Sequence, residues 1–482
     1  MLETFGETLD PEDWQGFRLQ SHRMLDDILD YTEKLRNRPV WQTIPPEVRG
    51  VFQQPVPKSA GDLAAAHAIF MQDVLPYAIG NAHPGFMGWV HGAGTPVGMM
   101  AEMLAAGLNA NVGGREQIPV EVERQLLRWV RELFAFPDTA SGLFVTGTSM
   151  ANFISVVVAR TALLGVAVRE TGLPSDHGLV VYASASAHVS IAQALDMAGL
   201  GTAALRKVAQ DENYRMDVKA LDAAIEQDRA AGLKPFMIVA TAGTVDVGAI
   251  DPLNDIADIA KRRSLWLHVD GAYGALGMLS ADIAALLKGI ERADSIAFDF
   301  HKWGQVPYDA GFVLVKDGEL HRSAFVSPAA YLQRGMRGMA AGSPWPCDFG
   351  PDLSRSFKAL KTWFTLMVYG TEKLGRVISN TCALAQHLKQ RIEATPMLEL
   401  LAPVALNIVC FCYRGSDQIN ADIVVALQES GIAAPSTTTI KGRLAIRAAI
   451  VNHRTQLCDI DALIDAVLDF GGRLGKMDER NE

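Results

Sequence analysis

Cysteine is scarce in this sequence, and the few that occur follow no recognisable pattern. The 482 residues include five of them, and no two form a CxxC pair (Cys347, Cys382, Cys410, Cys412 and Cys458). An odd, scattered set in a chain of this length is typical of reduced thiols in a cytoplasmic protein, not of a disulfide framework. No metal site is expected.

Long apolar runs and clusters of basic residues are also absent. No segment approaches the length that spans a bilayer, and the acidic residues 1–7 lack the positive start and apolar core of a signal peptide. A formal net charge of −10 without any Lys/Arg-rich run argues against a nucleic-acid surface. With 49% apolar and 20% charged residues, the composition is that of an ordinary globular enzyme. We therefore expect a cytoplasmic protein that binds neither membranes nor nucleic acids.

The middle of the chain alternates between short apolar runs and segments of helical length. This alternation predicts an α/β fold, with a mainly parallel sheet covered by helices on both faces and ligands at the carboxyl ends of its strands. The connection over residues 299–310 is too short for a comfortable crossover, so the last strand is expected to run antiparallel. The seven expected strands are 143–146, 179–183, 204–208, 236–241, 265–269, 295–298 and 311–315, and the expected helices are 149–165, 189–199, 217–230, 252–263 and 281–290.

Helices and a smaller unit flank this sheet. Apolar residues at three- and four-residue steps predict a helix over 12–35, and a second helical stretch follows near 60–75. Two such helices cannot enclose a core alone, so they are expected to lie across the main body or a second copy of the chain. After a long helix at 356–393, strands and helices alternate again. We divide the chain into an N-terminal helical arm (1–82), a large domain (83–372) and a small C-terminal domain (373–482).

A candidate phosphate site follows the strand at 143–146. Gly147, Thr148 and Ser149 lead from this strand directly into a helix. Free amides, two hydroxyls and the positive end of the helix dipole make such a junction a ready phosphate site. Two other interpretations stay open at this point. The hydroxyls could only cap the helix, or Ser149 could be the nucleophile of a serine hydrolase, because residues 147–151 nearly match its G-x-S-x-G turn.

Four further strand ends carry residues with useful chemistry. His188, Thr244 and Asp270 follow or end the next strands, and Lys302 stands just beyond the strand at 295–298. A buried carboxylate needs a partner, and a lysine at the end of an apolar strand can form a Schiff base. A phosphate cradle, a histidine that stacks, a hydroxyl, a carboxylate and such a lysine together fit pyridoxal 5′-phosphate.

The hydrolase interpretation explains less of the sequence. It uses only Ser149 and leaves the aspartate and the lysine without a role. It also needs a histidine, for which His321 and His453 have no supporting context.

The chain resembles the group II pyridoxal-phosphate-dependent amino-acid decarboxylases, the family of aromatic-L-amino-acid and glutamate decarboxylases. The similarity is carried by Leu-His-Val-Asp-Gly-Ala-Tyr at residues 267–273, by His-Lys-Trp at 301–303, and by the spacing between these motifs. The resemblance implies the fold of the pyridoxal-phosphate-dependent transferases (fold type I). That fold has a mixed seven-stranded large domain, a smaller C-terminal α/β domain and an N-terminal helical arm.

The resemblance also assigns roles to individual residues. It makes Lys302 the Schiff-base lysine and Asp270 the partner of the pyridine nitrogen, with His188 stacked on one face of the ring and Ala272 against the other. The other positions that it places at the cofactor are Thr148, Ser149 and His301 at the phosphate, in the cradle that begins at Gly147, with Ser295 and Asp299 nearby and Thr244 close to the ring.

Two positions depart from the family pattern. Met150 stands where an acidic residue is common, and Asp299 stands where asparagine is common. A carboxylate beside a phosphate is unfavourable, so Asp299 is expected to point away or to be paired.

A segment at residues 327–332 resembles the catalytic loop of the family, and Tyr331 falls on its tyrosine. Loss of carbon dioxide leaves a carbanion whose α-carbon needs a proton, and a tyrosine on a closing loop can supply it. In relatives that make aldehydes, phenylalanine is the common replacement. Tyr331 therefore favours simple decarboxylation to the amine.

The resulting hypothesis is a carboxy-lyase that converts an L-amino acid to its amine and carbon dioxide. The expected substrate pocket includes Phe86, Trp89 and His91, whose rings favour an aromatic or bulky substrate, although His91 and Arg115 leave an acidic one open. The family implies a homodimer in which residues 109–115 reach the partner's site. The alternatives are an aminotransferase, an aldehyde-forming oxidase, a serine hydrolase and a binding protein that keeps the cofactor.

Overall fold

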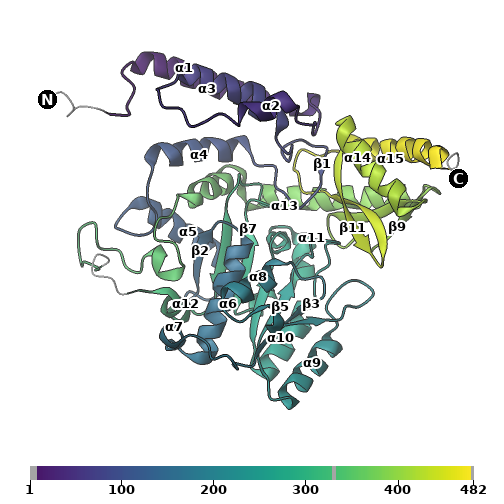
Figure 1. The fold of residues 1–482 in the computed structure, drawn as a ribbon. Coiled ribbons are helices and arrows are strands. Elements are labelled where there is room, and N and C mark those ends of the chain that lie inside the picture. Colours follow the sequence, from purple (N-terminus) through teal and green to yellow (C-terminus); the bar gives the residue numbers. More distant parts are fainter. Residues whose placement is uncertain (1–7, 328–332, 479–482) are drawn as a thin grey trace.

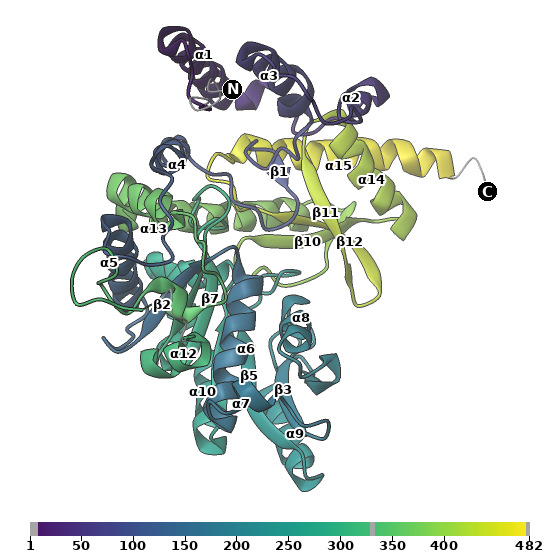
Figure 2. The same cartoon turned by 60° about the vertical axis from the view of Figure 1, so that its left-hand side comes forward.

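The computed structural model describes residues 8–327 and 333–478. An arm of helices comes first: α1 (Trp14–Glu33), α2 (Pro46–Val51) and α3 (Leu63–Ile69). Asp13 caps α1 by accepting hydrogen bonds from the amides of Gln15 and Gly16. Figures 1 and 2 both show the arm lying outside the two sheets of the molecule. No residue of α1 is buried, although the helix carries a regular apolar stripe.

The large sheet has seven strands in the order β2-β8-β7-β6-β5-β3-β4. Only β8 runs against its two neighbours β2 and β7, which confirms the expected reversal. The prediction of a mixed seven-stranded sheet is therefore confirmed. The strands are β2 (Ser141–Val145), β3 (Leu179–Ser184), β4 (Leu205–Val208), β5 (Lys234–Thr241), β6 (Trp266–Asp270), β7 (Ser295–Asp299) and β8 (Gly311–Val315).

Both faces of this sheet are covered by helices. Side chains alternate along a strand, so Phe144 and Tyr182 join one core cluster while their neighbours Val145 and Val181 join another. Burial on both faces explains why the strands read as continuous apolar runs. One face packs against α5 (Ile118–Leu133), α9 (Val218–Ala230) and α10 (Leu253–Arg263), and the other against α6 (Thr148–Leu164), α8 (Ser190–Met197) and α12 (Gly318–Phe325).

The expected helix at 281–290 is the clearest difference within this domain. Its place is taken by α11 (Ala281–Ala284) and two short 3-10 turns, Ala285–Leu287 and Ile290–Arg292. Gly289 has φ of 105°, a left-handed conformation that interrupts a helix. The short helix α7 (Val168–Thr171) completes the secondary structure around the large sheet.

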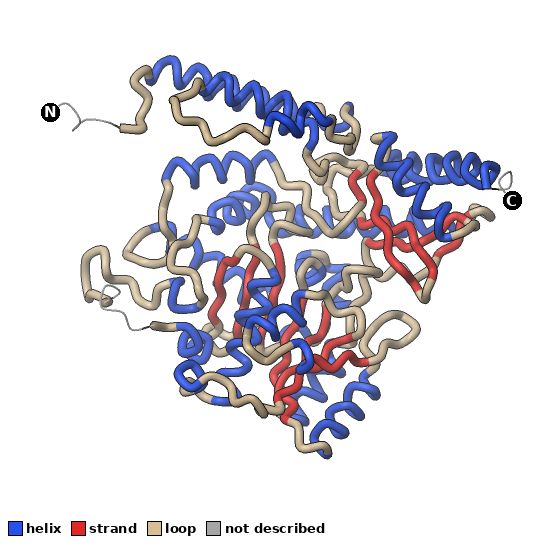
Figure 3. The backbone as a smooth tube through the Cα atoms, in the orientation of Figure 1, coloured by secondary structure: helices blue, strands red, loops and turns tan. Residues whose placement is uncertain are grey.

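A second, smaller sheet lies beside the large one, and Figure 3 shows the two as separate groups of strands. Its order is β1-β11-β12-β10-β9, and three of these strands, β1, β9 and β11, were not expected from the sequence. The first strand, β1, comes from far earlier in the chain and pairs with β11. The strands are β1 (Phe86–Met87), β9 (Leu398–Leu400), β10 (Ile408–Tyr413), β11 (Ala434–Ile440) and β12 (Arg443–Ala449), packed against α14 (Asp417–Ser430) and α15 (Leu457–Asp478).

The long helix α13 (Lys358–Glu393) runs past both sheets and packs against α4 (Pro96–Leu108). It is kinked at Gly370, which has φ of 68°. The predicted domain boundary at 372/373 falls within this helix, two residues beyond the kink, and stays a prediction.

The topology brings the predicted strand ends together. β3, β5, β6 and β7 are parallel, and β2 shares their direction because β8 lies antiparallel between β2 and β7. The residues that follow these five strands therefore meet at one edge of the large sheet.

Candidate active site

Lys302 lies in the turn that follows β7, at the carboxyl edge of the large sheet. Its ammonium forms an ion pair with Asp299, with 2.9 Å between Nζ and Oδ2. The side chain of Asp299 is 2% exposed and that of Lys302 is 22% exposed. Removing an ammonium from water costs free energy, and the nearby carboxylate offsets this cost.

The backbone around Lys302 is fixed by a close approach of the loop after β1. A Cβ atom on Gly92 would lie 2.2 Å from the carbonyl oxygen of His301 and 2.5 Å from that of Lys302. No side chain fits into that space, so Gly92 permits the contact. The loop that carries the predicted substrate-pocket residues Trp89 and His91 is thereby held against the lysine.

The predicted phosphate cradle forms the start of α6. Its N-cap residue, Gly147, offers no side-chain hydrogen bond, and the amide of Thr148 donates instead to Asp299 Oδ1 at 2.7 Å. The Thr148 hydroxyl is buried without a hydrogen-bond partner, while Ser149 is exposed. A buried orphan hydroxyl beside free helix amides is the chemistry of an anion site.

Asp270 ends β6 as a buried carboxylate, and Asn152 of α6 is its main partner. Asn152 Nδ2 donates to Asp270 Oδ2 at 3.1 Å, and the amide of Ala272 donates to Oδ1 at 3.2 Å. Burial raises the pKa of Asp270, and the charge of Lys302 and the Asn152 hydrogen bond act in the opposite direction. A cation placed against this carboxylate would be strongly favoured.

A chain of hydrogen bonds behind Asn152 fixes the orientation of its amide. An indole can only donate, so Trp266 Nε1 donates to the Ser295 hydroxyl at 2.9 Å. His268 contacts Ser295 through Nδ1 and Asn152 Oδ1 through Nε2, both at 2.9 Å. Burial lowers the pKa of His268 to about 3, so the ring is neutral and each of its nitrogens has one role. In this series of hydrogen bonds, from Trp266 through Ser295, His268 and Asn152, each group therefore donates in the direction of Asp270.

The same asparagine reaches His188 through a serine. Asn152 Nδ2 donates to Ser190 Oγ at 3.1 Å, and this hydroxyl lies 2.8 Å from His188 Nδ1. The amide of Ser190 also donates to His188 Nδ1, at 3.2 Å, so this nitrogen is the acceptor and the other carries the hydrogen. The exposed ring of His188 is thus oriented from behind.

Aromatic rings lead from the surface to the neighbourhood of Lys302. Trp89, 54% exposed, stacks on His91 at 5.9 Å between centroids, and His91 meets the edge of Tyr308 at 6.0 Å. Tyr308 in turn lies 4.4 Å from the ring of His301. Phe86 is buried and stacks behind His91 at 5.7 Å, so it supports the row instead of lining it.

The loop after β5 is held against the small domain. Thr244 is fully buried, and its hydroxyl accepts a hydrogen bond from the amide of Ala249 at 3.0 Å. Arg447 of β12 donates to the carbonyls of Val245 and Asp246 in this loop. The predicted position of Thr244 beside the ring stays a prediction.

Comparisons with known proteins agree with this arrangement. Residues 56–414 match the family model described as the pyridoxal-dependent decarboxylase conserved domain. An aromatic-L-amino-acid decarboxylase of Bacillus atrophaeus is 33% identical over 92% of both chains, and an L-2,4-diaminobutyrate decarboxylase of Rhizobium meliloti is 31% identical over 87% of this chain and 85% of its own. The chain belongs to the pyridoxal-dependent decarboxylase family. The crystal structure of Oryza sativa TDC with PLP and tryptamine shares the fold, with a TM-score of 0.88 at 24% identity over 97% of this chain and 100% of that one.

This family membership makes the protein a carboxy-lyase that uses pyridoxal phosphate. The predicted family, fold, cofactor and enzyme class are therefore confirmed. An aminotransferase is not supported.

The residues present fit this cofactor. The orphan Thr148 hydroxyl and the start of α6 suit a phosphate, the buried Asp270 suits a protonated ring nitrogen, and Lys302 supplies an amine at the same edge. Asp299 alone does not fit, because its carboxylate already takes the Thr148 amide. The sequence-based expectation that Asp299 is paired is met, since both Lys302 and Thr148 contact it.

Ser295 lies at the far end of β7 from the cradle, and its predicted place at the cofactor stays a prediction. This residue starts the five-residue strand β7, whereas the cradle contacts Asp299 at its other end. A strand rises about 3.3 Å per residue, which places Ser295 roughly 13 Å from the cradle. Its hydroxyl bonds to Trp266 and His268, so Ser295 belongs to the hydrogen bonds that support Asn152 and Asp270.

The serine-hydrolase interpretation of this decarboxylase is wrong. His321 bonds to Ser141 at the opposite end of β2, and His453 bonds to the carbonyl of Gly94. Neither histidine is directed at Ser149. Residues 147–151 therefore resemble the G-x-S-x-G turn only because both connect a strand to a helix.

Two further expectations concern Tyr331, in the expected catalytic loop, and Arg115. Tyr331 lies outside the described residues, and its role stays a prediction. Arg115, considered for an acidic substrate, stacks its guanidinium on Trp345 at 4.4 Å. This contact occupies it within its own subunit.

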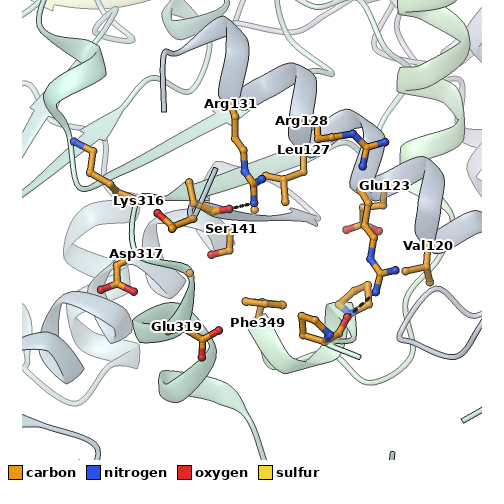
Figure 4. Close-up of a pocket in the computed structure, with 17 residues that line it drawn as sticks. Val120, Glu123, Leu127, Arg128, Arg131, Ser141, Lys316, Asp317, Glu319 and Phe349 are labelled. Atoms are coloured by element: carbon orange, nitrogen blue, oxygen red, sulfur yellow. Dashed lines mark hydrogen bonds between the residues drawn. The ribbon is translucent and has the colours of Figure 1, made fainter. Parts of the chain in front are cut away.

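A cavity of about 740 Å³ lies elsewhere in the decarboxylase fold. It is lined by α5, the start of β2 and residues 316–319 after β8, and Figure 4 shows Arg131 of α5 reaching the chain beside Ser141, with Asp317 and Glu319 at another side of the cavity. These strand termini are opposite to those that carry Lys302 and Thr148. The cavity is therefore separate from the candidate active site.

Two other kinds of site are not found among the described residues. No helix there combines the length and apolar character needed to cross a membrane. In the same part of the chain, no group of three or more His, Cys, Asp or Glu side chains could hold a metal ion.

Proposed function

We propose that this decarboxylase removes the α-carboxylate of an L-amino acid with an aromatic or bulky side chain and releases the amine. The observation that supports this most is the row of rings Trp89, His91, Tyr308 and His301, which ends beside Lys302. Stacked rings of this kind suit an aromatic or large apolar side chain. The aromatic-L-amino-acid decarboxylase among its relatives is consistent with that substrate class.

We propose the following roles for the site residues. The chemistry that bound pyridoxal phosphate supplies is an electron sink for the pair left on Cα when carbon dioxide departs. Lys302 would hold the cofactor through its aldehyde, and its amine would be free again once the substrate amine has taken its place. Asp270 holds the ring nitrogen in its protonated form, and its burial makes that charge pair favourable. The start of α6 binds the phosphate through its amides and the Thr148 hydroxyl.

The ring faces and the proton are assigned to other residues. His188, oriented by Ser190, stacks on one face of the cofactor, with Ala272 against the other and Thr244 close by. Tyr331 protonates the α-carbon after carbon dioxide has left, which directs the product to the amine.

We also propose a homodimer, built through the N-terminal arm. The helix α1 has 20 residues and none of them is buried, so part of its apolar stripe stays exposed within one subunit. Trp14 is 57% exposed and Phe17 is 42% exposed on α1, and Leu108 at the end of α4 is 59% exposed. Exposed apolar faces of this extent mark association surfaces. A second copy of the chain would cover them.

A cytoplasmic location is part of the same proposal. All five cysteines are free, including the buried Cys410 and Cys412, which suits a reducing compartment.

The direct test is an assay of purified protein with pyridoxal phosphate against a panel of L-amino acids. The panel contains tryptophan, tyrosine, phenylalanine, histidine, glutamate and 2,4-diaminobutyrate. Released carbon dioxide and the organic product are measured separately. We expect equal amounts of carbon dioxide and amine from an aromatic member. An aldehyde with hydrogen peroxide would identify an oxidase, and no turnover of any member would contradict the proposal.

A further inference from the structure

Asp299 holds, with one buried carboxylate, the same donors that a cofactor phosphate would need. Oδ1 accepts from the Thr148 amide at 2.7 Å, and Oδ2 lies 2.9 Å from Lys302 Nζ and 3.6 Å from His301 Nε2. His301 Nδ1 accepts from the amide of Ala310 at 2.9 Å, so the ring hydrogen stands on Nε2 and faces Asp299. The carboxylate is therefore surrounded by donors from three directions.

This position places two anions in competition. The Thr148 amide is the first free donor of α6, where the helix dipole attracts negative charge. In the neutral interior of a protein, two like charges at contact distance repel strongly. Asp299 and a phosphate cannot both use this amide. One of them has to leave it.

We propose that Asp299 is an internal competitor of the cofactor phosphate, a carboxylate that occupies the cradle and must turn away from Thr148 before the phosphate can bind. The same carboxylate holds Lys302, so its departure also releases the lysine that has to react. Asp299 thereby links arrival of the phosphate to release of Lys302. This inference rests on the proposed assignment of the phosphate to residues 147–149.

The inference predicts how cofactor affinity depends on this residue. Asp299→Asn keeps the shape of the side chain, removes its charge and supplies an amide that can donate to a phosphate. We expect pyridoxal phosphate to bind Asp299→Asn roughly tenfold or more tightly than the wild type, because a repulsion at contact distance is lost. Pyridoxal, which has no phosphate, should gain much less. The variant leaves the other charged or titratable groups around this carboxylate in place. They are Lys302, His301 and Tyr308, together with Asp309 and Lys361, which act on His301.

Asp309→Asn is the matched control. It removes the same charge from the same turn, but Asp309 pairs with Lys358 at 2.7 Å and does not touch the cradle. Its effect on the affinity for pyridoxal phosphate should be small. Asp299→Ser provides a second neutral variant with a small side chain, and it should move the affinity in the same direction as Asp299→Asn.

The experiment uses the full-length chain freed of cofactor by dialysis. Dissociation constants for pyridoxal phosphate and pyridoxal are measured by calorimetry, and the rise in melting temperature with inorganic phosphate is recorded. Tighter binding of pyridoxal phosphate, a selective gain over pyridoxal and a larger phosphate-induced rise in both Asp299 variants would support the competitor. Unchanged or weaker binding of pyridoxal phosphate in both would overturn it.

Thr148→Val separates this inference from the function on which it rests. Removing the orphan hydroxyl should weaken binding of pyridoxal phosphate without affecting pyridoxal. If Thr148→Val weakens binding while both Asp299 variants leave it unchanged, only the competitor role fails. If Thr148→Val has no effect, the phosphate does not bind at this cradle, and both the assignment and the inference are overturned.

Discussion

The side-chain amide of Asn152 donates to the carboxylate of Asp270 at 3.1 Å and contacts Ser190, the residue that orients His188. Asn152 belongs to α6, and Asp270 ends β6. One asparagine therefore couples the group proposed for the ring nitrogen to the group proposed for the ring face. Its own orientation is set by His268 from the opposite side.

Replacing Asn152 should weaken cofactor binding. Asn152→Leu leaves a buried carboxylate without its side-chain donor, which costs roughly 1–3 kcal/mol. This corresponds to about a tenfold to hundredfold higher dissociation constant for pyridoxal phosphate, measured by calorimetry. Asn420→Leu is the control, because Asn420 is equally buried but bonds only within the small domain. Equal affinity in wild type and Asn152→Leu would remove Asn152 from this role.

Stability should fall as the pH drops from 7 towards 4. Burial lowers the pKa of His268 and of His321 to about 3, below the ordinary value of 6.5. The neutral rings are favoured in the folded state, so their contribution is complete above pH 6.5. It is lost as the unfolded chain takes up protons between pH 6.5 and 3. At pH 5 each histidine accounts for about 2 kcal/mol of lost stability.

His321→Phe tests this pH dependence away from the active site. The ring of His321 lies between Phe325 and Phe349, so phenylalanine can take its place. The loss of unfolding free energy between pH 7.5 and 5, measured with urea, should be smaller in the variant by about 2 kcal/mol. His22, exposed on α1, is the control position. The same loss in wild type and His321→Phe would show that His321 does not titrate as described.

Tyr331→Phe should divert the product. Without the phenol, the α-carbon loses its proposed proton donor, so amine formation should fall at least tenfold. Aldehyde should increase in air, with dissolved oxygen as the oxidant and hydrogen peroxide and ammonia as the other products. Both products are quantified from the same reaction by mass spectrometry. The Arg337→Lys variant controls for changes elsewhere in this segment. An unchanged amine yield in Tyr331→Phe would exclude the tyrosine as the donor.

Charges on the exposed stripe of α1 should dissociate the proposed dimer. Trp14→Glu combined with Phe17→Glu places two carboxylates where a second copy would bury apolar rings. Light scattering should show a dimer for the wild type and a monomer for the double variant. Gln15→Glu, on the same helix turn, is the control. A monomeric wild type would contradict the proposal.

The strand ends were predictable because a single rule applies to them all. Five of the seven strands of the large sheet (β2, β3, β5, β6 and β7) end in or lead into one of the residues Thr148, His188, Thr244, Asp270 and Lys302, and their shared direction brings these positions to one edge. The sequence therefore indicated the cofactor before any contact was known.

The supporting residues could not be predicted in the same way. Asn152 and His268 lie inside a helix and a strand that read as apolar, and their bond joins residues far apart in the sequence. The sequence offered one signal for each of them, a polar residue at an expected core position. Asn152 stands one helical turn after Ser149, and His268 stands two residues before Asp270. Tyr308 gave no such signal, since its partners His91 and His301 are set by the course of two loops.

The strands that the sequence did not predict have a similar explanation. β11 contains Pro435 and a run of threonines, so it lacks the apolar character by which the other strands were found. β1 has only two residues and exists because β11 lies beside it. Pairing with distant partners, not local sequence, decides both strands.

The central claim is that Lys302 binds the cofactor covalently. Protein loaded with pyridoxal phosphate is reduced with borohydride, digested and mapped by mass spectrometry. Lys361→Ala serves as control, because Lys361 is a buried lysine paired with Glu102. We predict a pyridoxyl group on the peptide that contains Lys302 in the wild type and in Lys361→Ala, and none in Lys302→Ala. A pyridoxyl group on another lysine of the wild type, with Lys302 unmodified, would contradict it.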